Sequence, residues 1–334
     1  VPPWQAPVQT DRKGRDRAVD RKTPLIVITG PTGSGKTAIA LELARTYPLE
    51  AVSADSMQVY RHMDIATAKP SKAELSILPH HLIDVAEPDE EFNAGMFARR
   101  ARDAIHDILS RGKIPVIVGG TVLYIKALLY GLASAPPRSN RIRAGLTALA
   151  HEKGSSFLWK ILNRLDPDAA RNIGVNDRVR SIRALEIVFL TGRKASAFHR
   201  EHAFAEIRYG ARIVCVMPDR ARLYENIDTR VLRMVEKGLV EETRRLLDLG
   251  FGSALRSMQT LAYRHVIRHL ESQIGLDEAV SLIQRDTRRY AKRQIIWMRS
   301  NYGPGSFCAP ENAMTILSGL LRPRSPIGPA GQPV

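Results

Sequence analysis

The chain has 334 residues, more than one compact domain usually contains, so we expect one core and one sizeable elaboration. Hydrophobic residues make up 44% of it, which is enough for a true interior. Lys126 interrupts the longest apolar run, which falls short of the roughly 20 residues needed to cross a bilayer, so a soluble protein without a membrane partner is expected. The net charge of +16 can serve solubility alone, but it favours nucleic acid as a partner.

The chain contains two cysteines, Cys215 and Cys308, without paired spacing. This count excludes a disulfide framework and a Cys-x-x-Cys metal site, and it fits a reducing cytoplasm. Residues 1–23 mix prolines with charged residues and lack periodicity, so they are interpreted as a disordered lead-in. Residues 321–334 are interpreted as a loose tail.

Short apolar runs alternate with helical patterns along the chain. The runs predicted to be buried strands are Leu25–Thr29, Ala51–Ser53, His81–Val85, Ile114–Val118 and Ile213–Met217. The helical stretches are Lys36–Thr46, Ala94–Ser110, Arg222–Leu249 and Leu276–Arg299. This alternation predicts an α/β fold, a P-loop NTPase-like parallel sheet with helices on both faces.

The interval 138–202 breaks this rhythm, because it has helical periodicity and no strand pattern. It carries 13 Lys and Arg residues against six Asp and Glu residues. We therefore expect a helical RNA-binding insertion there, within a catalytic core formed by residues 24–137 and 203–320.

A glycine-rich motif follows the first predicted strand. Its residues are Gly30, Pro31, Thr32, Gly33, Ser34, Gly35, Lys36 and Thr37, which match G-x-x-x-x-G-K-[ST]. Such a loop points backbone N–H groups and the positive end of a helix at one anion. Lys36 would neutralise phosphate charge, and the Thr37 hydroxyl would bind Mg²⁺. The motif predicts a diphosphate or triphosphate site.

Nucleotide hydrolysis is less well supported than phosphate binding. A hydrolase needs an acid at the end of a neighbouring strand to hold Mg²⁺. The run Ile114–Val118 ends instead in Gly119-Gly120-Thr121, and Asp84 is the one strand-end candidate.

A carboxylate is predicted beside the glycine loop. Asp55 follows the second strand, and the crevice of a parallel sheet lies outside the carboxyl ends of its strands. Asp55 there can bind Mg²⁺, accept a proton or cap the next turn. Gln58, close behind it, offers a donor and an acceptor for a base edge.

Basic residues recur at helical spacing near the carboxyl end of the chain. Arg285, Arg288, Arg289, Lys292, Arg293 and Arg299 form a stripe with Tyr290 and Trp297. A second set, Arg178, Arg180 and Arg183, lies in the predicted insertion. Each can be a solvated face, but two such sets flanking one phosphate crevice suit RNA phosphates and unstacked bases.

Taken in order, these motifs resemble the bacterial type of the tRNA dimethylallyltransferase family, also called tRNA isopentenyltransferases. The resemblance runs from Gly30 to about Arg299. Besides the motifs above, it rests on Ala66–Pro70, Leu123-Tyr124, Asp166–Ala170, Arg183–Glu186 and Lys292–Gln294 with Trp297.

The resemblance implies a specific reaction. A dimethylallyl group would pass from dimethylallyl diphosphate to the N6 amine of the adenosine 3′ of the anticodon, in tRNAs that read codons beginning with U. The glycine loop would bind this diphosphate rather than ATP, Arg220 would clamp it, and Mg²⁺ would assist. Asp55 would be the general base. A monomer that binds the tRNA anticodon stem-loop is expected.

The positions that correspond to tRNA contacts by this resemblance form five groups. They are Asp55, Ser56, Met57 and Gln58; Thr121 and Arg143; Val179, Arg180, Ser181, Ile182 and Arg183; Gln259, Thr260, Leu261, Ala262, Tyr263 and Arg264; and Lys292, Arg293, Gln294, Ile295, Ile296, Trp297, Met298 and Arg299. The sequence departs from the family pattern at Val122 and Ala262, where glycine is usual, and at Val179, where glutamine is usual.

Three other functions share parts of this pattern. A P-loop small-molecule kinase shares the glycine loop but has no use for the basic helices. A non-catalytic RNA-binding NTPase would hydrolyse nucleotide without transferring a group. An adenylate isopentenyltransferase would accept free AMP in place of tRNA.

Overall fold

The computed structural model describes residues 25–133, 135–202 and 208–322. The lead-in predicted for residues 1–23 and residues 323–334 of the predicted tail lie outside the described residues. Leu321, assigned to that tail, instead ends the last helix and is 2% exposed. Contacts group the chain into two compact units, one of Val1–Leu129 with Arg208–Val334 and one of Tyr130–Ile207. Each unit is considered by itself.

The first unit is built on one sheet of six parallel strands. Their bounds are β1 Leu25–Thr29, β2 Leu49–Ser53, β3 His80–His81, β4 Ile114–Gly119, β5 Ala211–Val216 and β6 Phe307–Cys308. Their order across the sheet is β3-β2-β4-β1-β5-β6. The predicted fold class is confirmed.

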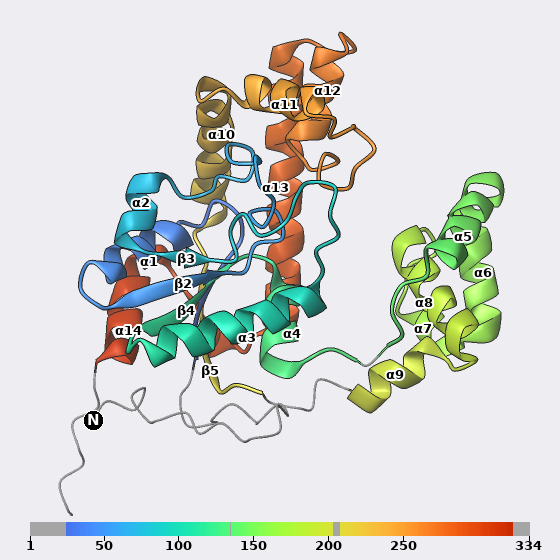
Figure 1. The fold of residues 1–334 in the computed structure, drawn as a ribbon, viewed down its shortest axis with the longest axis horizontal. Helices are drawn as coiled ribbons and strands as arrows, with labels where there is room; N and C mark the ends of the chain where they lie inside the picture. Colours follow the sequence, from blue (N-terminus) through green and yellow to red (C-terminus); the bar gives the residue numbers. More distant parts are fainter. Residues whose placement is uncertain (1–24, 134, 203–207, 323–334) are drawn as a thin grey trace, which may run out of the picture. The chain divides into compact units, whose positions relative to one another are not determined.

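Helices of the first unit cover the sheet and extend beyond it (Figure 1). Their bounds are α1 Lys36–Ala44, α2 Lys72–Ile77, α3 Ala94–Ser110, α4 Val122–Tyr130, α10 Arg220–Glu236, α11 Leu239–Asp248, α12 Tyr263–Leu270, α13 Leu276–Asn301 and α14 Pro310–Leu321, with a short 3₁₀ turn at Pro304–Ser306. No described helix is both long and apolar enough to span a membrane.

The core lies between the sheet and its helices. Ala40 and Leu43 of α1 and Leu317 of α14 pack on the buried strand residues Ile28 and Val116. Helix α3 packs on β2 and β4 from the other side (Figure 1). Strands β1 and β4 are buried along their whole length, which is why their sequences are continuous hydrophobic runs rather than alternating ones.

Two predicted elements differ from the structure. The strand predicted for His81–Val85 ends at His81, because Leu82 and Asp84 take positive φ values of 64° and 55° that cannot continue an extended chain. The helix predicted for Arg222–Leu249 is divided into α10 and α11 at Gly238, whose φ is 92°. Apolar periodicity continues across this break, so the pattern did not reveal it.

The second unit contains helices and no strand among its described residues. Its helices are α5 Asn140–Lys153, α6 Ser155–Leu165, α7 Pro167–Arg171, α8 Arg178–Thr191 and α9 Ala195–His202. Leu158, Leu162 and Leu185 are fully buried in its core. Glu186 is also buried and accepts a hydrogen bond from the Ser139 backbone N–H (2.7 Å).

Candidate active site in the P-loop unit

The glycine loop lies between β1 and α1, at the carboxyl edge of the sheet. Gly35, at the N-cap of α1, has a φ of 85°, a left-handed conformation that favours glycine. No side chain of the described residues caps α1, so its first N–H groups can bind an anion. Asn226 of α10 supports the loop by donating to the Gly33 carbonyl (3.0 Å). The loop therefore has the conformation that the sequence predicts for phosphate binding.

Two cations meet at this loop. Lys36 Nζ donates to the Pro31 carbonyl (3.2 Å), and Arg230 Nη1 of α10 donates to Thr32 Oγ1 (3.3 Å). Burial lowers the pKa of Lys36 to about 8, with a further contribution from Arg230. Burial also lowers the pKa of Arg230. Neither makes an ion pair within 4 Å among the described residues, so the pair is suited to a multiply charged anion.

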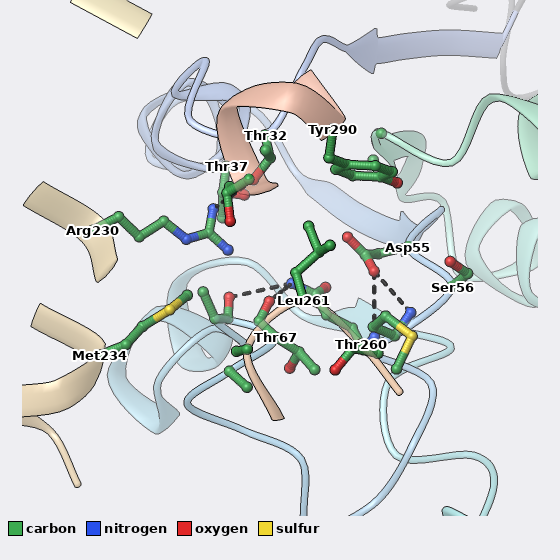
Figure 2. Close-up of a pocket in the computed structure, with 18 of the residues that line it drawn as sticks. Thr32, Thr37, Asp55, Ser56, Thr67, Arg230, Met234, Thr260, Leu261 and Tyr290 are labelled. Atoms are coloured by element: carbon green, nitrogen blue, oxygen red, sulfur yellow. Dashed lines mark hydrogen bonds between the residues drawn. The ribbon is translucent and has the colours of Figure 1, made fainter. Parts of the chain in front are cut away.

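These groups line a cavity of about 370 Å³. Arg230 and Asp55 reach into it from opposite sides (Figure 2). The apolar part of the wall includes Ile227, Val231 and Met234 of α10 and Ile283 of α13. The cavity thus combines a cationic end, an apolar wall and one carboxylate.

Asp55 follows β2 at the same edge of the sheet. Its Oδ1 accepts hydrogen bonds from the backbone N–H groups of Met57 (2.9 Å) and Gln58 (3.4 Å), so it does cap the following turn. Among the described residues, Oδ2 has no hydrogen-bond partner and remains available to a ligand. The Tyr290 hydroxyl lies near Asp55 in the cavity (Figure 2). Burial, together with the negative charge of Asp55, raises the pKa of Tyr290 to about 12.

The other polar groups near Asp55 make hydrogen bonds within the protein. Thr121 Oγ1 accepts from the Ser56 backbone N–H (3.0 Å) and donates to the Ser56 hydroxyl (3.3 Å). Gln58 Oε1 accepts from Ser53 Oγ (3.0 Å), and its Nε2 donates to the Ala68 carbonyl (3.2 Å). The Gln58 amide therefore fixes the cavity wall, and both of its polar ends are occupied.

Helix α13 joins the glycine loop to the end of β4 through one side chain. Gln294 Oε1 accepts from the Thr32 backbone N–H (2.9 Å), and its Nε2 donates to the Gly120 carbonyl (3.1 Å). A Cβ added at Gly120 would lie 2.8 Å from Gln294 Nε2 and 3.2 Å from the Gly30 carbonyl oxygen. The clash is more severe at Gly119, where a Cβ would lie 2.2 Å from the Ala54 carbonyl oxygen, so glycine at position 119 is required for the close approach of β4 to the segment after β2.

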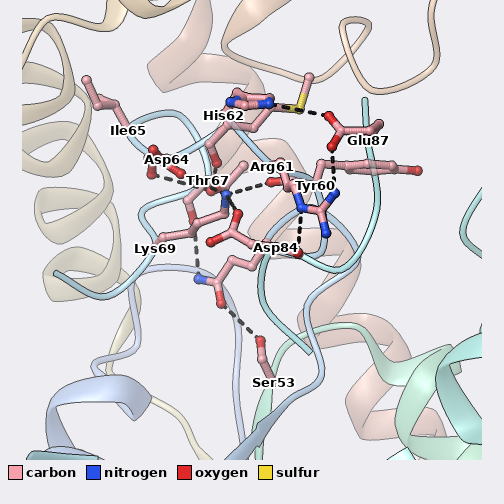
Figure 3. Close-up of polar contacts among 12 residues, drawn as sticks. Ser53, Tyr60, Arg61, His62, Asp64, Ile65, Thr67, Lys69, Asp84 and Glu87 are labelled. Atoms are coloured by element: carbon pink, nitrogen blue, oxygen red, sulfur yellow. Dashed lines mark hydrogen bonds and ion pairs between the residues drawn. The ribbon is translucent and has the colours of Figure 1, made fainter. Parts of the chain in front are cut away.

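A network of hydrogen bonds orders the segment after β2. Lys69 Nζ donates to the Tyr60 carbonyl and to the carboxylates of Asp64 and Asp84 (Figure 3). Asp84 was the strand-end candidate for Mg²⁺, but β3 ends before it and its carboxylate pairs with Lys69 instead. It is not among the residues that line the cavity.

A buried carboxylate anchors the same segment from α11. Glu242, 1% exposed, accepts from the backbone N–H groups of Asp64 (2.9 Å), Ile65 (2.8 Å) and Ala66 (3.1 Å). It also accepts from Tyr263 Oη (2.7 Å), at the start of α12. Glu242 thus connects two walls of the cavity, because Ala66 and the Gln259–Ala262 segment both line it.

The structure brings twelve of the predicted site residues to the cavity wall. They are Thr32, Lys36, Thr37, Asp55, Ser56, Met57, Gln58, Gln259, Thr260, Leu261, Ala262 and Gln294. Arg220 is not among them. It lies with Lys292, Ile295, Ile296 and Arg299 at a second cavity of about 320 Å³, with its guanidinium 5.2 Å from the Tyr224 ring.

The remaining predicted residues have other surroundings. Met298 is buried against Val122 and Cys215. Lys126 Nζ lies 5.2 Å from the Trp297 ring. In the second unit, Arg143 and Arg183 pair with Glu186, and Val179 is 64% exposed.

Two departures from the family pattern fit without strain. Ala262 has φ −80° and ψ −58°, a conformation that does not require glycine. Val122 is 7% exposed and begins α4.

Arg230 and Glu242 were missed from sequence. Arg230 lies on the face of α10 that carries Ile227, Val231 and Met234, so an arginine within an apolar stripe was the available signal. Glu242 was hidden among the acidic residues that begin α11.

Comparisons with known proteins agree on one family. Residues 58–301 match the model of a family described as IPP transferase. The tRNA dimethylallyltransferase 1 of Syntrophotalea carbinolica is 48% identical over 278 residues, which cover 83% of this chain and 88% of the relative. The crystal structure of the tRNA isopentenylpyrophosphate transferase of Bacillus halodurans is similar, with a TM-score of 0.63 and 35% identity over 89% of this chain and 96% of that one. A eukaryotic dimethylallyltransferase solved acting on tRNA has a TM-score of 0.70 and 28% identity, over 83% and 70%.

Proposed function

Because the chain belongs to the IPP transferase family, we propose that it transfers a dimethylallyl group from dimethylallyl diphosphate to a tRNA adenosine. The acceptor is the N6 amine of the adenosine 3′ of the anticodon in tRNAs that read codons beginning with U. The observation that carries this proposal is the joint cavity of a glycine loop, two cations and the Asp55 carboxylate.

The diphosphate binds at the cationic end of the cavity. Lys36, Arg230 and the N–H groups at the start of α1 supply positive charge where the leaving group gains negative charge. Arg230, rather than the predicted Arg220, takes the role of the clamp, since Arg230 lines the cavity and Arg220 does not. The apolar side chains of Ile227 and Met234 suit a five-carbon chain.

Asp55 is the base of this reaction. The adenine N6 forms a bond to the first carbon of the prenyl group as the bond from that carbon to the diphosphate oxygen breaks, and the N6 proton passes to Asp55 Oδ2. The bonds from Met57 and Gln58 to Oδ1 fix the carboxylate while Oδ2 stays free. The adenine has to leave its stack to reach this depth.

The donor set suits a Mg²⁺ ion that arrives with the diphosphate. Among the described residues, no group of three His, Cys, Asp or Glu side chains gathers as a metal site. Mg²⁺ commonly takes substrate phosphate oxygens and waters with one or two protein ligands, and the Thr37 hydroxyl at the cavity is the protein ligand proposed here. The ion would add positive charge to the leaving group.

The remaining proposals concern the RNA and the setting. The anticodon stem-loop contacts the stretches Gln259–Arg264 and Lys292–Arg299, together with Thr121. The insertion 138–202 adds Arg143 and Val179–Arg183. The enzyme works as a monomer in the cytoplasm.

A transfer assay tests this function. Full-length protein is incubated with labelled dimethylallyl diphosphate, Mg²⁺ and unmodified tRNA, with and without ATP. We expect label in the RNA without ATP and none in AMP supplied as the sole acceptor. Efficient label transfer to AMP would favour an adenylate isopentenyltransferase, and RNA-independent phosphate transfer from ATP would favour a kinase.

A further inference from the structure

Asp286, in the middle of α13, is the centre of a group of cations outside the cavity wall. Its Oδ1 lies 3.0 Å from Arg285 Nε and 3.6 Å from Arg289 Nη1. Its Oδ2 contacts Arg264 Nη2, near the start of α12, and lies 3.0 Å from His265 Nε2. These five residues, from two helices, are called the Asp286 cluster.

The cluster buries its carboxylate and exposes its guanidinium groups. The Asp286 side chain is 10% exposed, whereas those of Arg264, Arg285 and Arg289 are 36%, 45% and 64% exposed. Burial lowers the pKa of His265, so this imidazole does not add a charge at neutral pH. Three guanidinium charges against one carboxylate leave an excess of positive charge toward solvent. Exposed arginines of this kind suit phosphate oxygens.

The cluster lies beside the cavity on the same elements. Thr287 follows Asp286 directly and lines the cavity, as does Ala262, two residues before Arg264. We therefore expect the backbone of an RNA that delivers a base to Asp55 to pass near these arginines.

We infer that Asp286 is a positioning residue that holds Arg264, Arg285 and Arg289 as one surface for backbone phosphates of RNA. This inference rests on the proposed function, since it takes RNA to be the substrate. Without the carboxylate, three like charges repel one another and their long side chains spread over many rotamers. With it, they are ordered before RNA arrives, so less conformational entropy is lost on binding.

The substitution Asp286→Asn separates positioning from charge alone. It removes a negative charge from the surface, so a surface that acts through net charge alone would bind RNA more tightly. If Asp286 acts by positioning, its loss instead weakens RNA binding. We expect the Kd for anticodon stem-loop RNA to rise, on the order of tenfold, despite the added positive charge. The KM for tRNA should rise with it, while kcat and the KM for dimethylallyl diphosphate stay within about twofold of wild type.

Arg289→Ala provides a second variant, because Arg289 is the most exposed of the three arginines and its loss leaves the interior intact. Its matched control is Arg45→Ala, at the C-cap of α1. Arg45 is also 64% exposed and also pairs with a carboxylate three residues away, Glu42. We expect Arg289→Ala to reduce the steepness of log Kd against log salt concentration by about one, and Arg45→Ala to leave it unchanged.

The outcomes are distinguishable from one another. Unchanged or tighter RNA binding by Asp286→Asn, or equal salt slopes for Arg289→Ala and Arg45→Ala, would overturn the inference while transfer by the wild-type enzyme still supports the proposed function. If Asp286→Asn fails to fold, as its melting curve would reveal, Arg289→Ala decides. If the wild-type protein transfers no prenyl group to RNA, the proposed function itself fails.

Discussion

At the scale of single residues, the proposed chemistry depends on the different surroundings of the two Asp55 carboxylate oxygens. Oδ1 is held by two backbone N–H groups and Oδ2 is left without a partner among the described residues. The same side chain therefore both shapes the turn after β2 and offers a proton acceptor. The capping role considered from sequence and the catalytic role are compatible.

Asp55→Asn distinguishes these two roles. The amide oxygen can still accept from Met57 and Gln58, so the fold and the affinity for diphosphate should be kept. We expect kcat to fall about 10²- to 10⁴-fold, because an amide cannot take the amine proton. Single-turnover transfer to tRNA, with dimethylallyl diphosphate binding measured in parallel, checks this; a kcat near that of wild type would remove Asp55 from the role of base.

We expect the titration of Lys36 to make binding of the proposed diphosphate substrate depend on pH. Its pKa, about 8 in the empty protein against the ordinary 10.5, means that burial disfavours the charged form. The destabilisation from burying this charge is fully present below about pH 8 and fades as pH rises from there to 10.5. A bound diphosphate favours charged Lys36, so binding should take up a proton above pH 8.

We therefore expect the affinity for dimethylallyl diphosphate to fall as pH rises above about 8, by up to about tenfold per pH unit. Calorimetry at pH 7 and pH 9, in buffers of different ionisation enthalpy, measures both the affinity and the proton uptake. Lys36→Met is the control, since it retains only the titration of the ligand itself. The same pH dependence in that variant would contradict this explanation.

At the scale of elements, α13 bridges the glycine loop and the end of β4 through Gln294. Gln294→Ala would leave the Thr32 N–H and the Gly120 carbonyl without their shared partner. We expect diphosphate affinity to fall about fivefold to tenfold, since each bond contributes about 1 kcal/mol. Gln284→Ala on the same helix, which loses only a bond to the Asp228 carbonyl, is the control for α13 packing. Similar losses of affinity in both variants would show that helix packing, not the Gln294 bridge, is responsible.

Glu242 connects α11 to two walls of the cavity. A glutamine at position 242 has one acceptor oxygen for the four groups that donate to Glu242, namely three backbone N–H groups and the Tyr263 hydroxyl. Its NH₂ group would face donors and leave them without an acceptor. We expect Glu242→Gln to lower the free energy of unfolding by on the order of 3 kcal/mol and to raise amide exchange at residues 64–66. The exposed neighbour Glu241, substituted in the same way, should change neither. Urea unfolding and hydrogen exchange of the three proteins test this.

The elements were predictable where the signal is local. The β1 run, the glycine spacing and the start of α1 are adjacent in sequence, so the motif and its structure agree residue by residue. Arg230 contacts Thr32, which is 198 positions away in the sequence. Glu242 contacts residues 64–66, the first of which is 178 positions away. Periodicity carries no information about such pairs. The β3 error has a local cause, since apolar residues can occupy a bend as well as a strand.

At the scale of the whole molecule, the charge of +16 fits the attraction of RNA, and the cavity fits the binding of a diphosphate. In the proposed function, exposed arginines raise the local concentration of a polyanion, and a smaller set of half-buried cations selects a diphosphate. Composition suggested the first of these roles and the glycine motif the second. The geometry that joins them, with Asp55 facing Arg230 across the cavity, required the structure.

The most direct measurement of the central claim is a doubly labelled turnover. Dimethylallyl diphosphate carrying one label in the prenyl carbons and another in the phosphorus atoms is incubated with enzyme, Mg²⁺ and unmodified tRNA, without nucleotide. We expect the prenyl label on adenine N6 and the phosphorus label in free, intact diphosphate, in equal molar amounts. Release of diphosphate without prenylated RNA, or phosphorus label in the RNA, would contradict the account.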